Sequence, residues 1–168
     1  MTLHIRPAVR SDAALILALI KELAVYEKLE GDVVATEALL AETLFDPRAT
    51  AEALIATDAG KPAGFALFFH NYSTFLARPG IYLEDLFVRP AFRGRGIGRA
   101  LLAHIAHLAR ERQCGRLEWS VLDWNEPAIG FYRSLGAVPM DEWTTFRVTG
   151  DKLNALADLA LPATGTRT

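Results

Sequence analysis

The chain has 168 residues, of which 51% are hydrophobic and 23% are charged, and its formal net charge at pH 7 is −2. This balance is typical of a folded globular protein and excludes intrinsic disorder, because a disordered chain has too few apolar residues to form a core. A negative net charge argues against a general nucleic-acid-binding domain, which is normally strongly basic. The single cysteine, Cys114, excludes an internal disulfide framework and fits a reducing compartment.

The length suits one domain, because domains commonly contain about 100–200 residues. No repeat or low-complexity linker interrupts the sequence, and no apolar run approaches the ~20 residues that cross a bilayer. The N-terminus lacks the basic flank and apolar core of a signal peptide. We therefore expect a single domain over residues 1–160, a flexible tail over 161–168, a cytoplasmic location and no membrane partner.

In the first part of the chain, a short strand is followed by two helices and then by two strands. These five elements are predicted at residues 3–6, 13–26, 36–45, 53–56 and 63–69. Ser11-Asp12 offers the N-cap of the first helix, and Thr36-Glu37 starts the second. The turn signal Ala59-Gly60-Lys61-Pro62 separates the last two strands.

In the second part of the chain, strands and helices alternate. We expect a strong strand at 80–88, a long helix to about residue 113, a strand at 116–122, a helix at 125–135 and a last strand at 142–148. This order predicts an α/β fold with a mixed central sheet and helices on both faces.

A glycine-rich turn lies between the strand at 80–88 and the long helix, and it reads Arg93-Gly94-Arg95-Gly96-Ile97-Gly98-Arg99. Alternate glycines permit positive φ angles and let a ligand approach the backbone. The N–H groups of the turn and the helix N-terminus together form an anion site. A Walker loop needs Gly-Lys-Ser/Thr, and a dinucleotide fingerprint needs Gly-x-Gly-x-x-Gly; neither occurs here. We predict that the turn binds a pyrophosphate without a metal, and that Arg93, Arg95 or Arg99 adds positive charge.

Four segments carry a family resemblance: Ile5-Arg6-Pro7-Ala8; Leu19 to Glu27; Tyr82-Leu-Glu-Asp-Leu-Phe-Val88 with Arg93–Gly98; and Trp124-Asn-Glu-Pro-Ala-Ile-Gly-Phe-Tyr132 with Gly136-Ala137. Together they resemble the GNAT superfamily of acyl-CoA-dependent N-acetyltransferases, and within it the spermidine/spermine (diamine) acetyltransferase group. The resemblance covers about residues 3–157. It implies the GNAT fold with a mostly antiparallel sheet, acetyl-CoA as co-substrate, no metal, direct transfer to a small-molecule amine in a ternary complex, and a homodimer.

The resemblance also implies where the coenzyme binds. The backbone of Leu86, Phe87 and Val88 would pair with the pantetheine arm as a further strand does. The turn Gly94–Arg99, with Arg93, would hold the pyrophosphate. The far side of the arm would be lined by Asn125, Glu126, Pro127 and Ala128.

The expected reaction requires two proton transfers. An alkylamine with a pKa near 10.4 is only about one part in 10³ neutral near pH 7.4, so the site needs a proton acceptor. The departing thiolate benefits from a proton donor. The resemblance gives these roles to Glu84 and Tyr132, respectively. Strand alternation predicts that Glu84 and Asp85 face opposite sides and are not a coupled pair, which leaves Asp85 a structural or dimer-contact role.

The acceptor is the least determined part of this interpretation. The resemblance places Tyr26, Glu27 and Glu84 in the amine pocket. The positive charges of Lys28 and Arg78 would repel a polycationic substrate, so they depart from the pattern of a polyamine-binding site. A diamine or polyamine and a lysine-like amino acid therefore both remain open as acceptors. Two other functions are also open: acetylation of protein lysines or N-termini, and non-catalytic acyl-CoA binding on the same fold.

Overall fold

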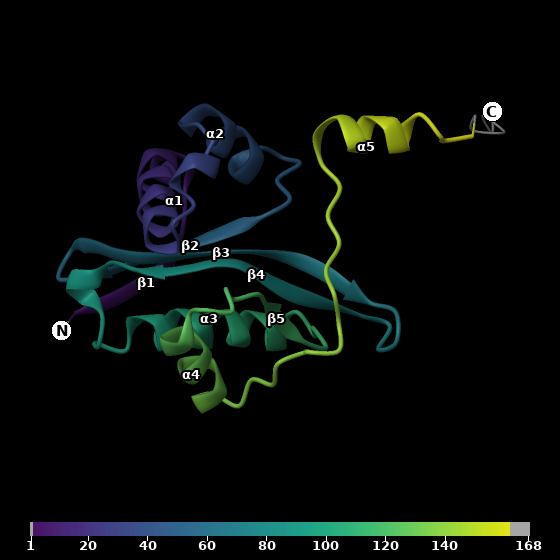
Figure 1. The fold of residues 1–168 in the computed structure, drawn as a ribbon. Coiled ribbons are helices and arrows are strands. Elements are labelled where there is room, and N and C mark those ends of the chain that lie inside the picture. Colours follow the sequence, from purple (N-terminus) through teal and green to yellow (C-terminus); the bar gives the residue numbers. More distant parts are fainter. Residues whose placement is uncertain (1, 162–168) are drawn as a thin grey trace. The chain divides into compact units, whose positions relative to one another are not determined.

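The computed structural model describes residues 2–161. Within this range, the sheet has five strands in the order β1-β2-β3-β4-β5 (Figure 1). They are β1 (Leu3–Pro7), β2 (Glu52–Asp58), β3 (Lys61–Ser73), β4 (Arg78–Val88) and β5 (Leu117–Trp119). Strands β1 to β4 pair antiparallel, and β5 pairs parallel to β4. The predicted mixed, mostly antiparallel sheet is confirmed.

Helices cover both faces of this sheet, as predicted. Helices α1 (Ala13–Glu27) and α2 (Glu37–Phe45) lie on one face, and α3 (Ile97–Glu111) lies on the other (Figure 1). On the α1 face, Ile16 and Leu19 pack in one buried cluster with Ile55, Phe65 and Phe87. On the other face, the buried residues Ile97, Leu101 and Ile105 belong to α3, which contacts β2, β3 and β4.

The predicted helix starts are correct in position, although one cap works differently. Thr36 precedes α2, and its hydroxyl oxygen accepts a hydrogen bond from the backbone N–H of Leu39 at 3.2 Å. Asp12 precedes α1 but makes no side-chain cap. Its carboxylate pairs with Arg6 and accepts from the backbone N–H of Val9, so it fixes the single-turn helix η1 (Arg10–Asp12) instead.

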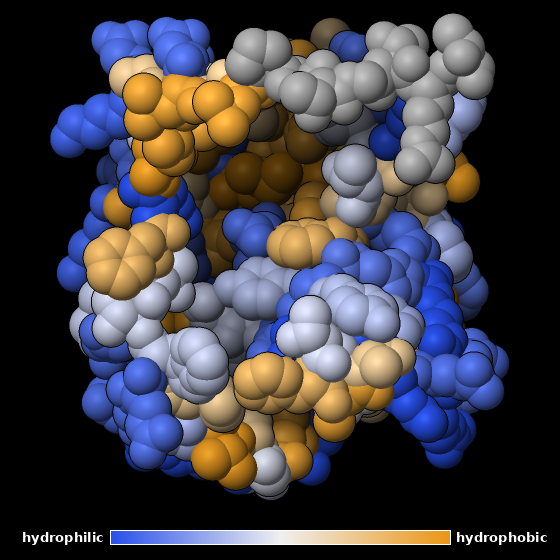
Figure 2. Space-filling model, turned by 90° about the vertical axis from the view of Figure 1, so that its right-hand side faces the viewer, coloured by the Kyte–Doolittle hydropathy of each residue, from blue (hydrophilic) through white to orange (hydrophobic). Residues whose placement is uncertain are grey.

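Two hairpin turns connect β2 to β3 and β3 to β4. Between β2 and β3, Ala59 and Gly60 both have positive φ, the backbone of a two-residue hairpin turn, as the sequence predicts. Between β3 and β4, the turn exposes the apolar side chains of Phe75 and Leu76. Figure 2 shows one face of the molecule, on which hydrophobic groups lie among hydrophilic ones.

Two compact units can be distinguished, Met1–Asn125 and Glu126–Thr168. The second contains α4 (Glu126–Ser134) and α5 (Gly150–Ala157). Helix α4 confirms the helix predicted at 125–135, and Gly136 follows it with φ +85°. Helix α5 was not predicted. The domain over 1–160 stays a prediction, and of the predicted tail, residues 162–168 lie outside the described range.

Two strand predictions need correction. The strand expected at 116–122 is only three residues long, Leu117–Trp119. The strand expected at 142–148 does not form within residues 2–161, where this segment has no regular secondary structure. A strand requires hydrogen bonds to a neighbour, which residue preferences alone cannot supply. No helix in the described range is long and apolar enough to cross a membrane.

Candidate functional site

The site begins with an open edge of β4. Strand β5 pairs with β4 only from Ile81 to Leu83. In the described part of the chain, residues 84–88 of β4 have no partner on the β5 side, and 85–88 pair with β3 alone. Unpaired N–H and C=O groups of this kind accept an added strand or an amide-containing ligand. This edge includes Leu86, Phe87 and Val88, whose backbone was predicted to hold the pantetheine arm.

The glycine-rich turn follows directly after β4 and the short helix η3 (Pro90–Phe92). Gly94 and Gly96 have φ of +74° and +77°, so the predicted positive-φ positions are present. A Cβ atom added at either glycine would meet no atom within 4 Å, which means that the backbone here is open to an approaching ligand. Helix α3 begins at Ile97 without a side-chain N-cap, so its first N–H groups are not satisfied by a capping side chain.

The arginines near this turn differ in what they already bind. Arg89 pairs with Glu22 of α1 at 2.7 Å, and Arg95 pairs with Asp58 of β2 at 3.1 Å. Arg93 donates to the backbone oxygen of Val88 at 2.9 Å, and its guanidinium lies 4.6 Å from the ring centroid of Tyr26. Arg99 is exposed and forms no ion pair with any residue from 2 to 161. Among the predicted phosphate ligands, the side chain of Arg99 is therefore the one available without breaking a contact.

Two carboxylates meet at a β-bulge in β4. In the pairing with β3, Asp85 lies opposite Leu67 and Leu83 lies opposite Phe68, so Glu84 is an extra residue without a partner on β3. The bulge interrupts the regular alternation of side chains. Glu84 is exposed and Asp85 is partly buried, yet the charge of Glu84 still acts on Asp85, which strand alternation alone does not predict.

Asp85 has the more perturbed environment of these two carboxylates. Burial raises its pKa to about 6, with added contributions from the negative charges of Glu84 and of Glu27 at the end of α1. Burial also raises the pKa of Glu27. Glu84 itself is exposed. The concentration of negative charge next to the open edge suits a cationic ligand, and it makes Asp85 a site candidate that strand alternation missed.

Tyr26 links the predicted amine pocket to the predicted coenzyme site. Its hydroxyl donates to Oδ1 of the buried Asn125 at 3.1 Å, and its ring lies 6.1 Å from that of Trp124. Lys28 lies over the same Trp124 ring at 5.2 Å from the ring centroid. Because Arg93 lies over its ring, Tyr26 contacts both the glycine-rich turn and Asn125. The sequence alone predicts separate roles for Tyr26, in the amine pocket, and for Arg93 and Asn125, at the coenzyme.

The remaining predicted residues lie on α4, in the second unit. Glu126, Pro127 and Ala128 form its first turn, and Tyr132 lies near its end. Tyr132 is half-buried, and its ring lies 5.3 Å from that of Phe131. The role of Tyr132 as proton donor stays a prediction.

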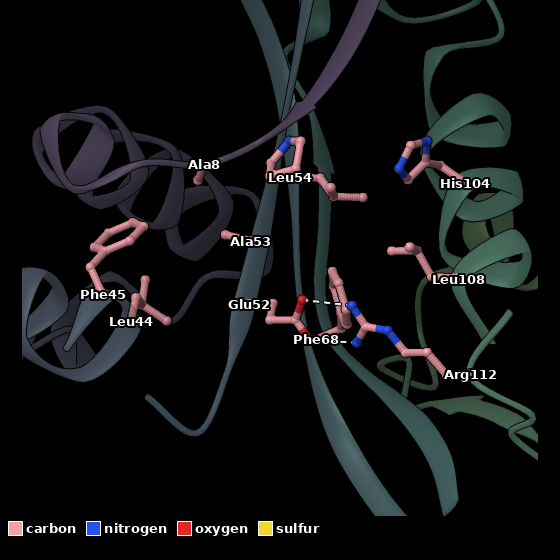
Figure 3. Close-up of a pocket in the computed structure, with 11 residues that line it drawn as sticks. Ala8, Leu44, Phe45, Glu52, Ala53, Leu54, Phe68, His104, Leu108 and Arg112 are labelled. Atoms are coloured by element: carbon pink, nitrogen blue, oxygen red, sulfur yellow. Dashed lines mark hydrogen bonds and ion pairs between the residues drawn. The ribbon is translucent and has the colours of Figure 1, made fainter. Parts of the chain in front are cut away.

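A shallow hollow of about 160 Å³ lies along β2, near the opposite edge of the sheet (Figure 3). Its charged lining is the pair formed by Arg112 and Glu52, joined by contacts of 2.5 and 2.8 Å. None of the predicted site residues lines it. Because the charge of Arg112 is already neutralised, the hollow offers no free charge to a ligand. Among residues 2–161, no group of three or more His, Cys, Asp or Glu side chains is arranged to hold a metal ion.

Comparison with known proteins gives consistent matches. Residues 18–137 match the model of the acetyltransferase (GNAT) family. The chain is 35% identical to L-ornithine N5-acetyltransferase NATA1 of Arabidopsis thaliana, over 93% of this chain and 88% of that protein. It is 41% identical to thialysine N-epsilon-acetyltransferase of Bos taurus, over 91% and 96%. The structure of integron cassette protein VCH_CASS6, from the mobile metagenome of V. cholerae, superimposes with a TM-score of 0.78 at 31% identity, over 94% of this chain and 98% of that one.

Proposed function

The chain belongs to the GNAT acetyltransferase family and is an acetyl-CoA-dependent N-acetyltransferase, and we propose that its acceptor is the side-chain amine of a small amino acid. One observation carries the acceptor proposal: the charges of Glu84 and Glu27 both act on the poorly solvated carboxyl of Asp85 beside the open edge of β4. A primary ammonium group placed there would be attracted by all three carboxylates.

Two further points favour an ornithine- or lysine-like amino acid over a polyamine. Two relatives that match over most of their length are named for ornithine and thialysine. Lys28, next to Glu27, adds a positive charge that would oppose a second or third ammonium group of a polyamine. Arg78 does not add to this effect, because it begins β4, six residues before Glu84 and about 20 Å away along an extended strand.

The coenzyme would be held by the chain's backbone. Leu86, Phe87 and the N–H of Val88 would pair with the amide groups of pantetheine. The N–H groups of Gly94 to Arg99 would bind the diphosphate, with charge from Arg99. The far side of the arm would be lined by Asn125, Glu126, Pro127 and Ala128. When bound, acetyl-CoA supplies an acetyl thioester to this channel.

Two side chains would move protons. Glu84 would accept the proton of the acceptor ammonium, directly or through water, so that the amine, which is mostly protonated at neutral pH, can attack as a neutral nucleophile. Asp85 would bind the ammonium before that step. The hydroxyl of Tyr132 would donate a proton to the departing sulfur.

Release of free thiol from acetyl-CoA tests the proposal. The acceptors are ornithine, lysine, thialysine, putrescine, spermidine and a lysine-containing peptide. We expect the highest kcat/KM with an amino acid that carries a side-chain amine. Higher kcat/KM with spermidine or the peptide would overturn the acceptor class. Coenzyme binding without turnover on any amine would overturn catalysis.

We also propose a cytoplasmic homodimer with no nucleic-acid or membrane partner. The single cysteine supports a reducing compartment, and the net charge of −2 argues against a nucleic-acid partner. The dimer follows from the family resemblance. Light scattering on the purified chain should give twice the chain mass, and a monomer at micromolar concentration would contradict the dimer.

A further inference from the structure

Asp58 is a buried carboxylate outside the proposed catalytic group. It ends β2 and is 4% exposed. One carboxylate oxygen accepts from the backbone N–H of Thr2 at 3.0 Å, and the other accepts from Arg95 Nη1 at 3.1 Å. A buried carboxylate is costly unless a cation compensates it. Within residues 2–161, Arg95 is the cation that forms an ion pair with Asp58.

Arg95 belongs to the glycine-rich turn, and both terminal nitrogens of its guanidinium donate to protein groups. Besides Asp58, it donates from Nη2 to the backbone oxygen of Ala91 at 3.2 Å. It also lies 5.4 Å from the ring centroid of Phe92. The side chain therefore ties the turn to the end of β2 and to η3. Moving it to a phosphate would leave the charge of Asp58 buried and uncompensated.

Such an anchor matters in this turn because glycines lie on both sides of Arg95. Gly94 and Gly96, on either side of Arg95, both have positive φ, and a Cβ at either would meet nothing within 4 Å. Glycine backbone loses more conformational freedom on ordering than any other residue. If CoA had to order this turn, part of its binding free energy would be lost. The Asp58–Arg95 pair fixes the residue between the two glycines before any ligand arrives.

We propose that Asp58 is a positioning residue for the coenzyme: through Arg95 it holds the backbone N–H groups of the turn ready for the diphosphate. Arg95 then acts as an anchor, and Arg99 provides the side-chain charge. This inference rests on the proposed assignment of the turn to the diphosphate.

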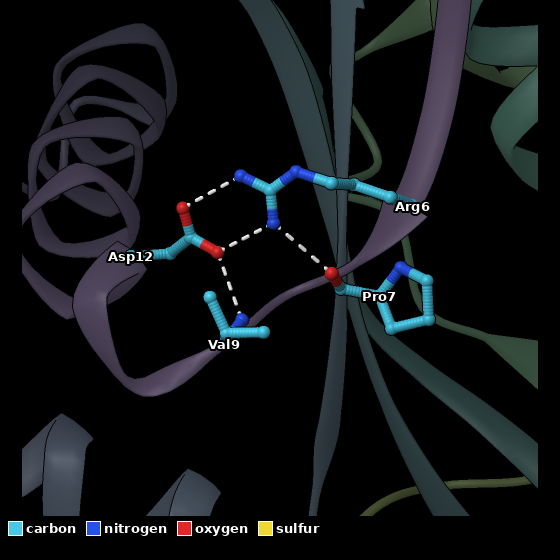
Figure 4. A network of polar contacts seen from close by, with 4 residues as sticks. All are labelled: Arg6, Pro7, Val9 and Asp12. Atoms are coloured by element: carbon cyan, nitrogen blue, oxygen red, sulfur yellow. Dashed lines mark hydrogen bonds and ion pairs between the residues drawn. The ribbon is translucent and has the colours of Figure 1, made fainter.

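A matched control exists at the other end of β1. Asp12 is also buried, at 8% exposed, pairs with Arg6 at 2.6 Å and accepts from a backbone N–H, that of Val9 (Figure 4). Asp58→Asn and Asp12→Asn therefore remove the same kind of buried ion pair, but only the first is connected to the turn. Isothermal titration calorimetry with CoA and urea unfolding are measured for both variants.

Asp58→Asn is expected to raise the Kd of CoA about 10-fold, and Asp12→Asn is expected to change it less than about 2-fold. Both variants should lose a similar free energy of unfolding. The KM of S-acetylpantetheine, which lacks the diphosphate, should stay unchanged in both. An unchanged CoA Kd in Asp58→Asn, or equal weakening in both variants, would overturn the proposal.

Two further variants complete the test. If Asp58→Asn does not fold, Arg95→Gln, at a half-exposed position, is expected to give the same selective loss of CoA affinity. Where both fold, the double variant should bind CoA no more weakly than either single variant, because the two residues act as one unit. Additive losses would overturn the proposal. The assignment of the turn to the diphosphate is tested independently by Gly96→Val in the otherwise unaltered chain. If that assignment is wrong, Gly96→Val leaves the affinity for CoA unchanged.

Discussion

Glu84 and Asp85 are neighbours at a β-bulge of β4, where burial and then the negative charge of Glu84 raise the pKa of Asp85 to about 6. A carboxyl with this pKa is partly protonated at mildly acidic pH and mostly charged at neutral pH. An ammonium ligand would lower that pKa again, because it supplies the opposite charge. Amine binding near pH 6 is therefore coupled to release of a proton from Asp85.

The stability of the chain should depend on pH through Asp85. Its pKa in the folded state, about 6, lies above its ordinary value of 3.8, so the folded state binds the proton more tightly than the unfolded state does. This contribution is fully present below pH 4 and is lost as the pH rises to about 6, by about 2 to 3 kcal/mol. Urea unfolding between pH 3.5 and 8 should show this loss in the original chain but not in Asp85→Asn. Parallel curves would contradict the raised pKa.

Glu84→Gln should lower kcat about 100-fold near neutral pH, because the ammonium acceptor loses its proton acceptor. The deficit should shrink toward pH 10, where the amine deprotonates on its own. The pH dependence of kcat, measured by thiol release, checks this. Glu30→Gln, which changes an exposed carboxylate on η2 (Glu30–Asp32), serves as the control. A deficit of the same size at every pH would exclude Glu84 as the proton acceptor.

Tyr132→Phe should lower kcat about 100-fold while the Kd of CoA changes little. The substitution keeps the ring and removes only the proposed donor to the departing sulfur. Phe131→Leu, which changes the neighbouring ring on α4, separates loss of packing from loss of the hydroxyl. Full activity of Tyr132→Phe would remove the donor role.

Gly96→Val should abolish measurable CoA binding, because it places a side chain on the open side of the turn and strains a residue at φ +77°. Gly60→Val is the matched control, since Gly60 has φ +75° and its added Cβ also meets nothing within 4 Å. Both should lose about 1–2 kcal/mol of stability from backbone strain. Calorimetry should show lost affinity only for Gly96→Val, and equal effects would contradict the assignment of the turn.

Tyr26→Phe should moderately weaken the binding of both acetyl-CoA and the amine. It removes the hydrogen bond to Asn125 but keeps the ring beside Arg93 and Trp124. We expect a loss of about 1 kcal/mol in stability and a rise of several-fold in the KM of acetyl-CoA and of the amine. A rise in the amine KM alone would restrict Tyr26 to the acceptor pocket.

Much of the fold could be predicted from local patterns. Alternating apolar residues and a hairpin turn signal predict β2 and β3, and leucines at helical spacing predict α1. The prediction of a strand at 142–148 was wrong, because a strand needs a neighbouring strand that the local sequence does not specify. Helix α5 was not predicted, because no element was assigned between the strand expected at 142–148 and the tail, although Leu153 and Leu156 have helical spacing.

The sequence indicates candidate residues for the site but not the contacts between them. Glycines at alternate positions indicated an anion-binding turn, and Gly94 and Gly96 do have positive φ. The bulge at Glu84 comes from the register between β3 and β4, which no local pattern in β4 encodes. The pairing of Arg95 with Asp58 joins residues 37 positions apart, so its role as an anchor was not visible.

A crystal structure of the chain with CoA tests the central claim most directly. The account predicts diphosphate oxygens within hydrogen-bond distance of the backbone nitrogens of residues 94–99, pantetheine amides along Leu86 to Val88, and Arg95 still paired with Asp58. A diphosphate bound elsewhere, with the turn vacant, would contradict it.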